Sequence, residues 1–252
     1  MNEQKSGVLV RRWPPGGGGY DVVIVDAEAT VADYLRALEP LAGDQGLRRA
    51  RNPGGTCYAC PRCCAERIPL TSIDVRELAA ATAAGEGRGH AGRPDALAQA
   101  GGEARLLLEV VRRYAWVSVM GRAVDVSLRR GEDGACLLLD AGRGLCRYYA
   151  SRPLVCRTYF CCPASRRARI LRERIVNQGQ DELVRLLLEE TGTAMFPFNE
   201  ADAPRLCAGD WRENGFSGRR TYAEVRLREV LPRRWWRQFY GAGPSGEGAR
   251  GG

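Results

Sequence analysis

The stretch Cys57-Tyr58-Ala59-Cys60-Pro61-Arg62-Cys63-Cys64 places four thiols within eight residues. Thiols this dense ligate metal, form disulfides or carry redox chemistry. Short Cys-x-x-Cys spacing lets two thiolates converge on one ion, as in zinc knuckles and ferredoxin loops. The adjacent side chains of Cys63 and Cys64 point in different directions, so we do not expect them to share one mononuclear ion. The pair indicates a polynuclear cluster, two sites, or one ligand and one spare thiol.

A second block of cysteines follows much later in the chain. It consists of Cys136, Cys146, Cys156, Cys161 and Cys162. The first block begins like the bacterial ferredoxin run Cys-x2-Cys-x2-Cys-x3-Cys-Pro, but its fourth cysteine directly follows the third. We therefore interpret the first block as half of a site that the second block completes. Substituting Cys156 or Cys161 should then release metal as effectively as substituting Cys60. Cys207 stands alone and is interpreted as a non-ligand.

Composition narrows the chemistry of the site. His90 is the only histidine, which argues against His-based zinc sites, Ser-His-Asp triads and Cys-His dyads. Any transition metal should therefore be bound by thiolates. The formal net charge of +8 comes almost wholly from arginine, with Lys5 as the only lysine. Such a bias is weak evidence for a nucleic-acid partner.

The sequence predicts a cytoplasmic protein without a membrane span. No apolar run approaches the roughly 20 residues that cross a bilayer. The N-terminal stretch lacks the apolar core of a secretory signal. In a reducing compartment, clustered cysteines are more often metal ligands or catalytic groups than disulfides.

We expect a helix-rich α+β fold in which a small antiparallel hairpin or sheet packs with helices and Cys-ligated metal joins the two blocks. The predicted division is a ββα-like extension at 1–55, a metal-binding domain at 56–163, C-terminal helices packed on it at 164–240, and a disordered tail at 241–252. The extension should hold strands near 8–10 and 20–25 and a helix from Thr30 to about Leu41.

Further elements follow from local patterns. Thr71-x-x-Asp74 resembles a capping box and should begin a helix that reaches about Ala84. A Gly-rich loop at 85–93 holds His90, and a second helix should run from Pro94 to about Trp116. A strand should follow at 124–128, and a hairpin should pair 136–140 with 145–149. One or two helices should span 164–191, with a possible break at 177–180. A last helix should span 221–240, with a kink at Pro232.

The cysteine pattern resembles the YkgJ-type family of zinc- or iron-chelating proteins, whose motif is Cys-x2-Cys-x2-Cys-Cys. The resemblance covers about residues 56–162. Besides the first block, it rests on Ile68-Pro69-Leu70-Thr71-Ser72-Ile73-Asp74, Cys136-Leu137-Leu138-Leu139-Asp140, Cys146-Arg147-Tyr148-Tyr149, and Arg152-Pro153-Leu154-Val155-Cys156-Arg157-Thr158-Tyr159-Phe160-Cys161. Two positions depart from the family: Phe160 stands where proline is usual, and Cys162 is an added thiol.

The resemblance implies metal binding. The expected ligands are Cys57, Cys60, Cys63, Cys64, Cys136, Cys146, Cys156 and Cys161. An iron–sulfur cluster is preferred because of the vicinal pair and the ferredoxin-like spacing, and structural zinc is the alternative, since thiolate sites suit both. Arg152 and Arg157 are candidates to offset the negative charge of a cluster or to donate N–H groups to sulfur; surface arginines near a turn explain them equally well.

Other functions stay open at this point. The family resemblance extends to some flagellin lysine N-methylases, and vicinal thiols also suit a thiol oxidoreductase. A structural zinc protein that presents basic helices to a protein partner is a third interpretation. Arginines alternate with Trp235, Trp236, Phe239 and Tyr240 near the C-terminus, a composition that can bind single-stranded nucleic acid. Docking of these aromatic residues onto the core is the stronger interpretation.

Overall fold

The computed structural model describes residues 7–13, 17–58, 60–86 and 102–241. Its first elements are the antiparallel strands β1 (Val8–Trp13) and β2 (Gly19–Ile24) and the helix α1 (Val31–Leu38). A capping box begins α1: Thr30 Oγ1 accepts from the backbone N–H of Asp33, and the Asp33 carboxylate accepts from that of Thr30. The strands and helix that the sequence predicts here are confirmed.

The C-terminal helices pack against these N-terminal elements. They are α7 (Leu227–Val230) and α8 (Arg233–Phe239), and their apolar residues share one core with β1, β2 and α1. The prediction of one kinked helix over 221–240 is wrong. Pro232 lacks the N–H that would continue α7 and instead caps α8, so two short helices form.

A second core lies around α2 (Ser72–Glu86) and α4 (Glu103–Tyr114). The sheet that packs here has the order β4-β3-β7. Its strands are β3 (Ala115–Met120), β4 (Ala123–Leu128) and β7 (Glu200–Asp202), of which β7 pairs with β3 in parallel. The predicted helix does not reach Trp116, because alternating burial from Ala115 onward makes that segment a strand. Its expected start at Pro94 and the His90 loop lie outside the described residues.

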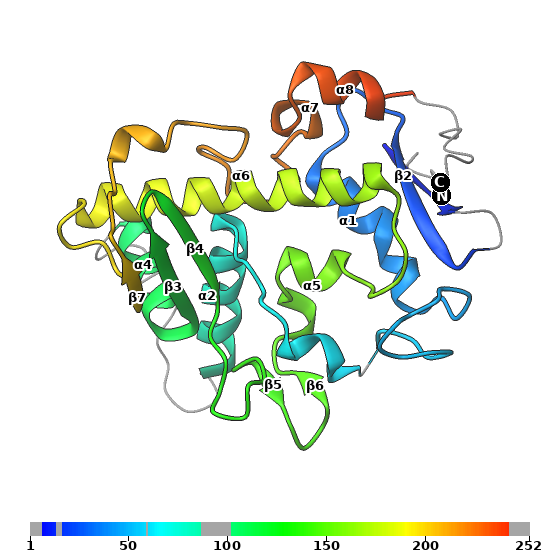
Figure 1. Ribbon diagram of the computed structural model, residues 1–252, viewed down its shortest axis with the longest axis horizontal. Coiled ribbons are helices and arrows are strands. Elements are labelled where there is room, and N and C mark those ends of the chain that lie inside the picture. Colours follow the sequence, from blue (N-terminus) through cyan, green and yellow to red (C-terminus); the bar gives the residue numbers. More distant parts are fainter. Residues whose placement is uncertain (1–6, 14–16, 59, 87–101, 242–252) are drawn as a thin grey trace.

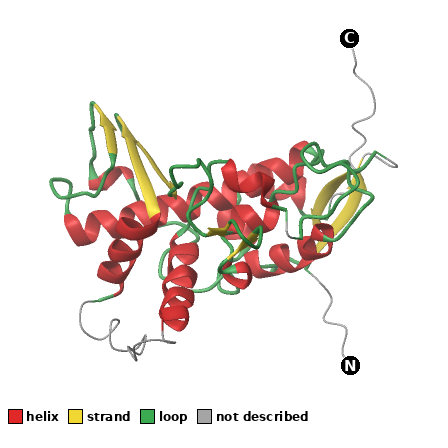
Figure 2. Cartoon of the chain, turned by 90° about the horizontal axis from the view of Figure 1, so that it is seen from below, coloured by secondary structure: helices red, strands yellow, loops and turns green. Residues whose placement is uncertain are grey.

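The long helix α6 (Arg166–Thr191) joins the two cores (Figures 1 and 2). Leu171 and Ile175 belong to the first core, and Leu183 and Leu187 to the second. The possible break at 177–180 does not occur. Gly179 lies against the start of α2, where an added Cβ would stand 2.5 Å from Thr71 Cγ2. The absence of a side chain at Gly179 therefore allows α6 to pack closely against the start of α2, and the helix continues through this residue.

The cysteine-bearing segments lie together on one side of α6 in Figure 1. They comprise the 3₁₀ turn η2 (Pro61–Ala65), the hairpin β5 (Leu139–Asp140) with β6 (Leu145–Cys146), the turn η3 (Tyr149–Ser151) and the helix α5 (Leu154–Thr158). Two more 3₁₀ turns are η1 (Glu39–Ala42) and η4 (Ala208–Asp210). The predicted hairpin is confirmed, with shorter strands than expected.

The helix-rich α+β class is confirmed, with β7 as a parallel addition to the small antiparallel sheets. Residues 8–47 share the first core with residues between 154 and 239. The domain division at 55, 163 and 240 stays a prediction, and of the expected tail at 241–252 all residues after Gly241 lie outside the described residues. Within the described residues, no helix combines the length and apolar character that crossing a bilayer requires.

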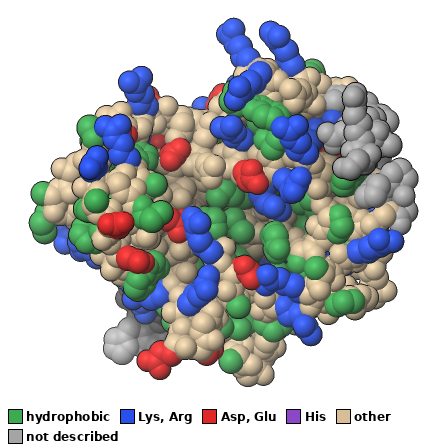
Figure 3. Space-filling view, viewed as in Figure 1, with side chains coloured by type: hydrophobic (Ala, Val, Ile, Leu, Met, Phe, Trp, Pro, Cys, Tyr) green, Lys and Arg blue, Asp and Glu red, His purple; other side chains and the backbone are tan. Residues whose placement is uncertain are grey.

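Three of the four aromatic residues singled out near the C-terminus pack inward, and the fourth, Tyr240, is exposed. Phe239 is buried, and Trp235 and Trp236 contact the first core. Arginine side chains stand out over α7 and α8 (Figure 3). Arg228 forms an ion pair with Glu28, at 2.6 Å. These contacts agree with docking of the aromatic residues onto the core.

One buried carboxylate ties three distant segments together. Asp74 completes the capping box of α2 with Thr71, as the sequence predicts. Its Oδ1 also accepts from the backbone N–H of Leu154, at 2.8 Å, and from the Tyr222 hydroxyl, at 2.6 Å. The starts of α2 and α5 are thereby fixed to each other and to the C-terminal region.

Replacing Tyr222 with Phe tests this link. The change removes a buried hydroxyl that donates to Asp74 and lies 2.7 Å from Thr71 Oγ1. We expect the free energy of unfolding to fall by about 2 kcal/mol in urea denaturation followed by circular dichroism. The control Tyr240→Phe alters an exposed ring and should change it by less than about 0.5 kcal/mol. Equal effects of the two variants would contradict the link.

Candidate metal centre

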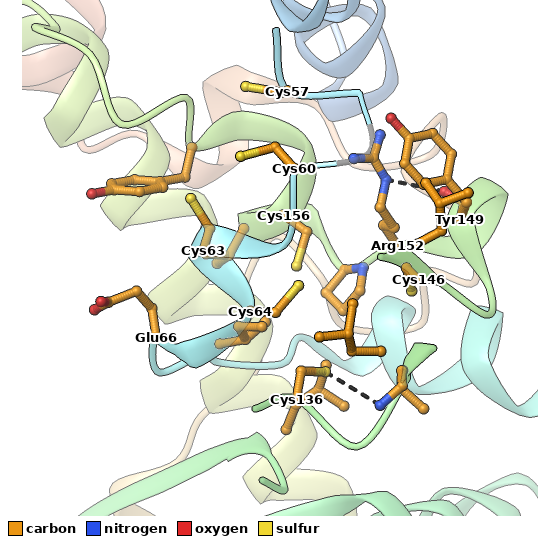
Figure 4. Close-up of a pocket in the computed structure, with 18 of the residues that line it drawn as sticks. Cys57, Cys60, Cys63, Cys64, Glu66, Cys136, Cys146, Tyr149, Arg152 and Cys156 are labelled. Atoms are coloured by element: carbon orange, nitrogen blue, oxygen red, sulfur yellow. Dashed lines mark hydrogen bonds between the residues drawn. The ribbon is translucent and has the colours of Figure 1, made fainter. Parts of the chain in front are cut away.

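All eight cysteines that the sequence nominates as ligands line one cavity of about 220 Å³. It lies between η2, the β5–β6 hairpin and α5, and Figure 4 shows the thiols arranged around it. All ten cysteines of the chain are free thiols. The two sequence blocks therefore meet in space, as the sequence interpretation expects, while the role of each thiol as a ligand stays a prediction.

The first block is positioned by a loop and a tight turn. The backbone N–H of Cys57 donates to the carbonyl of Ala42 at 2.7 Å. Cys60 precedes η2, which carries Cys63 and Cys64. Side chains three residues apart in a 3₁₀ turn eclipse one another, whereas neighbours diverge by about 120°. Cys63 and Cys64 therefore point in different directions, and Figure 4 shows the sulfur of Cys60, which precedes the turn, on the side of Cys63.

The second block reaches the cavity from three short elements. The backbone N–H of Cys136 donates to the carbonyl of Cys64 at 2.7 Å, which joins the blocks directly. Cys146 ends β6 and Cys156 lies on α5. Cys161 follows α5 with a left-handed backbone (φ 47°), a conformation that costs a non-glycine residue about 1 kcal/mol or more. Its carbonyl accepts from the backbone N–H of Ala50 at 2.8 Å.

Burial dominates the acid–base properties of the free thiols. It raises the pKa of Cys63 to about 12 and that of Cys136 to about 11, and neighbouring cysteines raise both further. The pKa of Cys156 lies well above its ordinary value for the same reasons. Cys63, Cys136 and Cys156 are therefore protonated in the metal-free protein at neutral pH, and a bound metal would displace their protons.

The buried guanidinium of Arg49 also borders the cavity, although the sequence analysis did not identify this residue. Arg49 is only 2% exposed, and its Nε–H donates to Cys57 Sγ at 3.1 Å. Its other N–H groups donate to the carbonyls of Leu41, Ala42, Asp44 and Gly55. Among the described residues, no carboxylate forms an ion pair with Arg49. Its positive charge therefore faces a sulfur and a ring of carbonyl oxygens.

The two predicted cofactor arginines lie in different places. Arg152 lines the cavity, stacks 3.7 Å from the centre of the Tyr149 ring and donates to the Tyr149 carbonyl at 3.0 Å. Arg157 is not among the residues that line it. Its charge instead acts on Glu77 of α2, whose pKa burial raises to about 7, helped by Asp74 and opposed by Arg157.

The two remaining cysteines stand apart from the cavity. Cys207 is exposed, beside η4. Cys162 lines a neighbouring pocket of about 340 Å³ together with Arg169 and Arg172, and Cys161 lines both pockets.

Phe160, which departs from the family pattern, is buried edge-to-face against Tyr20 of β2, with ring centroids 5.8 Å apart.

The sulfurs surround the cavity without converging on one point. Among the described residues, no three Cys, His, Asp or Glu side chains are grouped closely enough to hold a single ion as they stand. A tetrahedral zinc with bonds of about 2.3 Å would bring its sulfurs within about 4 Å of one another. Donor type and number fit a thiolate metal centre, and a mononuclear ion would require side-chain rotation.

Comparison with known proteins agrees with this chemistry. Residues 56–178 match the family model "CxxCxxCC: Putative zinc- or iron-chelating domain". We call these matching residues the CxxCxxCC domain. The match extends into α6, beyond the end at 163 that the sequence analysis expects. The CxxCxxCC domain includes all eight nominated cysteines, whereas Arg49 lies outside it. Searches of curated proteins and of solved structures gave no match.

Replacing Arg49 with Met tests its part in building the cavity wall. The change leaves buried carbonyl oxygens without donors, so the free energy of unfolding of the metal-free protein should fall by about 3 kcal/mol. Arg48→Met is the matched control, because its side chain is exposed. Urea denaturation measures both. A loss for Arg49→Met no larger than that of Arg48→Met would show that the buried guanidinium is dispensable.

Glu77 gives a prediction about pH. Its pKa is raised in the folded protein, so folding favours the protonated form, and stability should decrease as pH rises from about 4.5 to about 7. The variant Glu77→Gln lacks this titration. Its free energy of unfolding should therefore fall less than that of the wild type over this range in paired urea titrations. Glu173→Gln, at an exposed site on α6, is the control and should follow the wild type. Parallel curves for the wild type and Glu77→Gln would contradict the prediction.

Proposed function

We propose that this chain is a cytoplasmic metal-binding protein whose cysteine cavity holds an iron–sulfur cluster. The observation that carries the proposal is the gathering of eight free thiols, from two distant blocks, around one cavity. The CxxCxxCC domain supports metal binding in general.

The shape of the site favours a cluster over a single ion. A structural zinc site is closed, with four ligands converged on the ion. Here the thiols surround a volume of about 220 Å³, and no three described donor side chains are grouped to hold one ion. A cluster has iron and sulfide atoms of its own to fill such a space, and cysteine thiolates are its usual ligands.

The surrounding charges also suit a thiolate centre. The Nε–H of Arg49 already points at Cys57 Sγ, and Arg152 lies at the cavity wall beside Tyr149. Hydrogen bonds and positive charge near the sulfurs raise the reduction potential of a cluster. Such a group would supply electron transfer or structural cross-linking, while the chain's own residues hold it and shield it from water.

Structural zinc is the second candidate. It is favoured by the short Cys-x-x-Cys spacing and by the family description, which includes zinc. In that case the metal would serve to fix the loop at Cys57–Cys64 against α5 and the β5–β6 hairpin. Zinc binding would then contribute directly to folding stability.

Anaerobic purification from iron-replete cells separates the two candidates. The iron–sulfur proposal predicts brown protein with charge-transfer absorption in the visible region and stoichiometric iron and acid-labile sulfide. Elemental analysis and a sulfide assay provide the measurement. Colourless protein that carries only zinc would contradict the cluster and support structural zinc.

A further inference from the structure

We propose, on the basis of the metal binding proposed above, that the cavity contains two four-thiolate sites and not one eight-thiolate site. The first set comprises Cys57, Cys60, Cys63 and Cys161. The second set comprises Cys64, Cys136, Cys146 and Cys156. Each set combines ligands from both sequence blocks, so both sites require the folded chain.

The turn η2 makes the division at the vicinal pair. Cys63 and Cys64 are neighbours in the 3₁₀ turn, so their side chains project from different faces of it. In Figure 4 the sulfurs of Cys60 and Cys63 lie with Cys57, and the sulfur of Cys64 lies beside that of Cys156. The adjacent thiols thus serve opposite ends of the cavity.

The hydrophobic cores support the same division. Cys136 belongs to the second core, and Cys64, Cys146 and Cys156 pack against it. Cys57 packs against the first core. The backbone hydrogen bonds follow the same division. The N–H of Cys136 donates to the carbonyl of Cys64, whereas the carbonyl of Cys161 accepts from the N–H of Ala50, which precedes Cys57 by seven residues. The second set is therefore attached to the second core, whereas Cys57 of the first set is attached to the first core.

Electrostatic neighbours provide a further check. Beyond burial, which is the largest cause, the pKa of Cys63 is raised by Cys161, Cys60 and Cys57. Beyond burial, the thiols that raise the pKa of Cys156 are Cys136, Cys146 and Cys64. For each of these two thiols, the cysteines whose charge raises its pKa are the other three members of its own set. Cys60 also acts on Cys64, which places the two sets side by side.

Each set has its own arginine. Arg49 donates to Cys57 in the first set. Arg152 lies nearer the second set, where its charge opposes the effect of burial on the pKa of Cys64 and Cys146. Four thiolates around a divalent ion leave a net charge of about −2, so a separate positive group beside each set offsets part of it.

The spacing of the first set in the sequence is also similar to that of cluster ligands in two-cluster ferredoxins. In two-cluster ferredoxins, three cysteines of a Cys-x2-Cys-x2-Cys run combine with a remote cysteine to hold one cluster. Cys57, Cys60 and Cys63 have this spacing, and Cys161 supplies the remote ligand. Cys64 is then free to join the second set.

The test compares metal content per chain in full-length protein purified anaerobically. The variants are Cys60→Ser for the first set, Cys156→Ser for the second, and the double variant, with Cys207→Ser as an exposed control. We expect each single variant to keep about half of the wild-type metal, the double variant to keep none, and the control to keep all of it. The ratio holds whether the metal is iron or zinc.

The wild type alone gives an independent measurement if a variant does not fold, as judged by circular dichroism. Two sites predict two metal centres per chain, which are two zinc ions, two two-iron clusters or two four-iron clusters, and EPR spectra together with the iron content distinguish the cluster types. One zinc ion or one four-iron cluster per chain would overturn the two-site proposal and leave metal binding intact. Loss of all metal from either folded single variant would also overturn it. Wild-type protein without metal would overturn the proposed function itself.

Discussion

The buried carboxylate of Asp74 holds the two halves of the site in register. It caps α2, which follows the first cysteine block closely, and it accepts the first backbone N–H of α5, which carries Cys156. Tyr222 donates to the same carboxylate from the C-terminal region. Because a buried carboxylate is costly unless its oxygens are hydrogen-bonded, these contacts act as one unit. The spacing between the cysteine blocks depends on that unit.

The cavity has the chemistry of a metal centre. Eight thiols line this space, where apolar residues could have filled it. Burial raises the pKa of Cys63, Cys136 and Cys156. Metal ions replace thiol protons and thereby compensate for burial. Arg49 comes from outside the CxxCxxCC domain and donates to Cys57. The N-terminal segment of this chain therefore contributes to the wall of the site.

The sequence predicted features that local chemistry determines. The Thr71–Asp74 capping box, the Thr30 helix start and the hairpin before Cys146 all follow from short-range patterns, and the structure confirms them. It did not predict that Ala115 begins a strand, because apolar residues continue from α4 without a break. Nothing local distinguishes Arg49 from its arginine neighbours. Its burial arises only when the loop closes around it, and the approach of Cys161 to the cavity that the first block lines is likewise a product of tertiary structure.

X-ray absorption spectroscopy of the anaerobically purified protein tests the central claim that thiolates alone bind the metal. We expect a first coordination shell of sulfur only, with about four sulfur neighbours per metal atom, and iron–iron scattering if clusters are present. Nitrogen or oxygen neighbours in that shell, or a metal-free protein with its cysteines paired as disulfides, would contradict it.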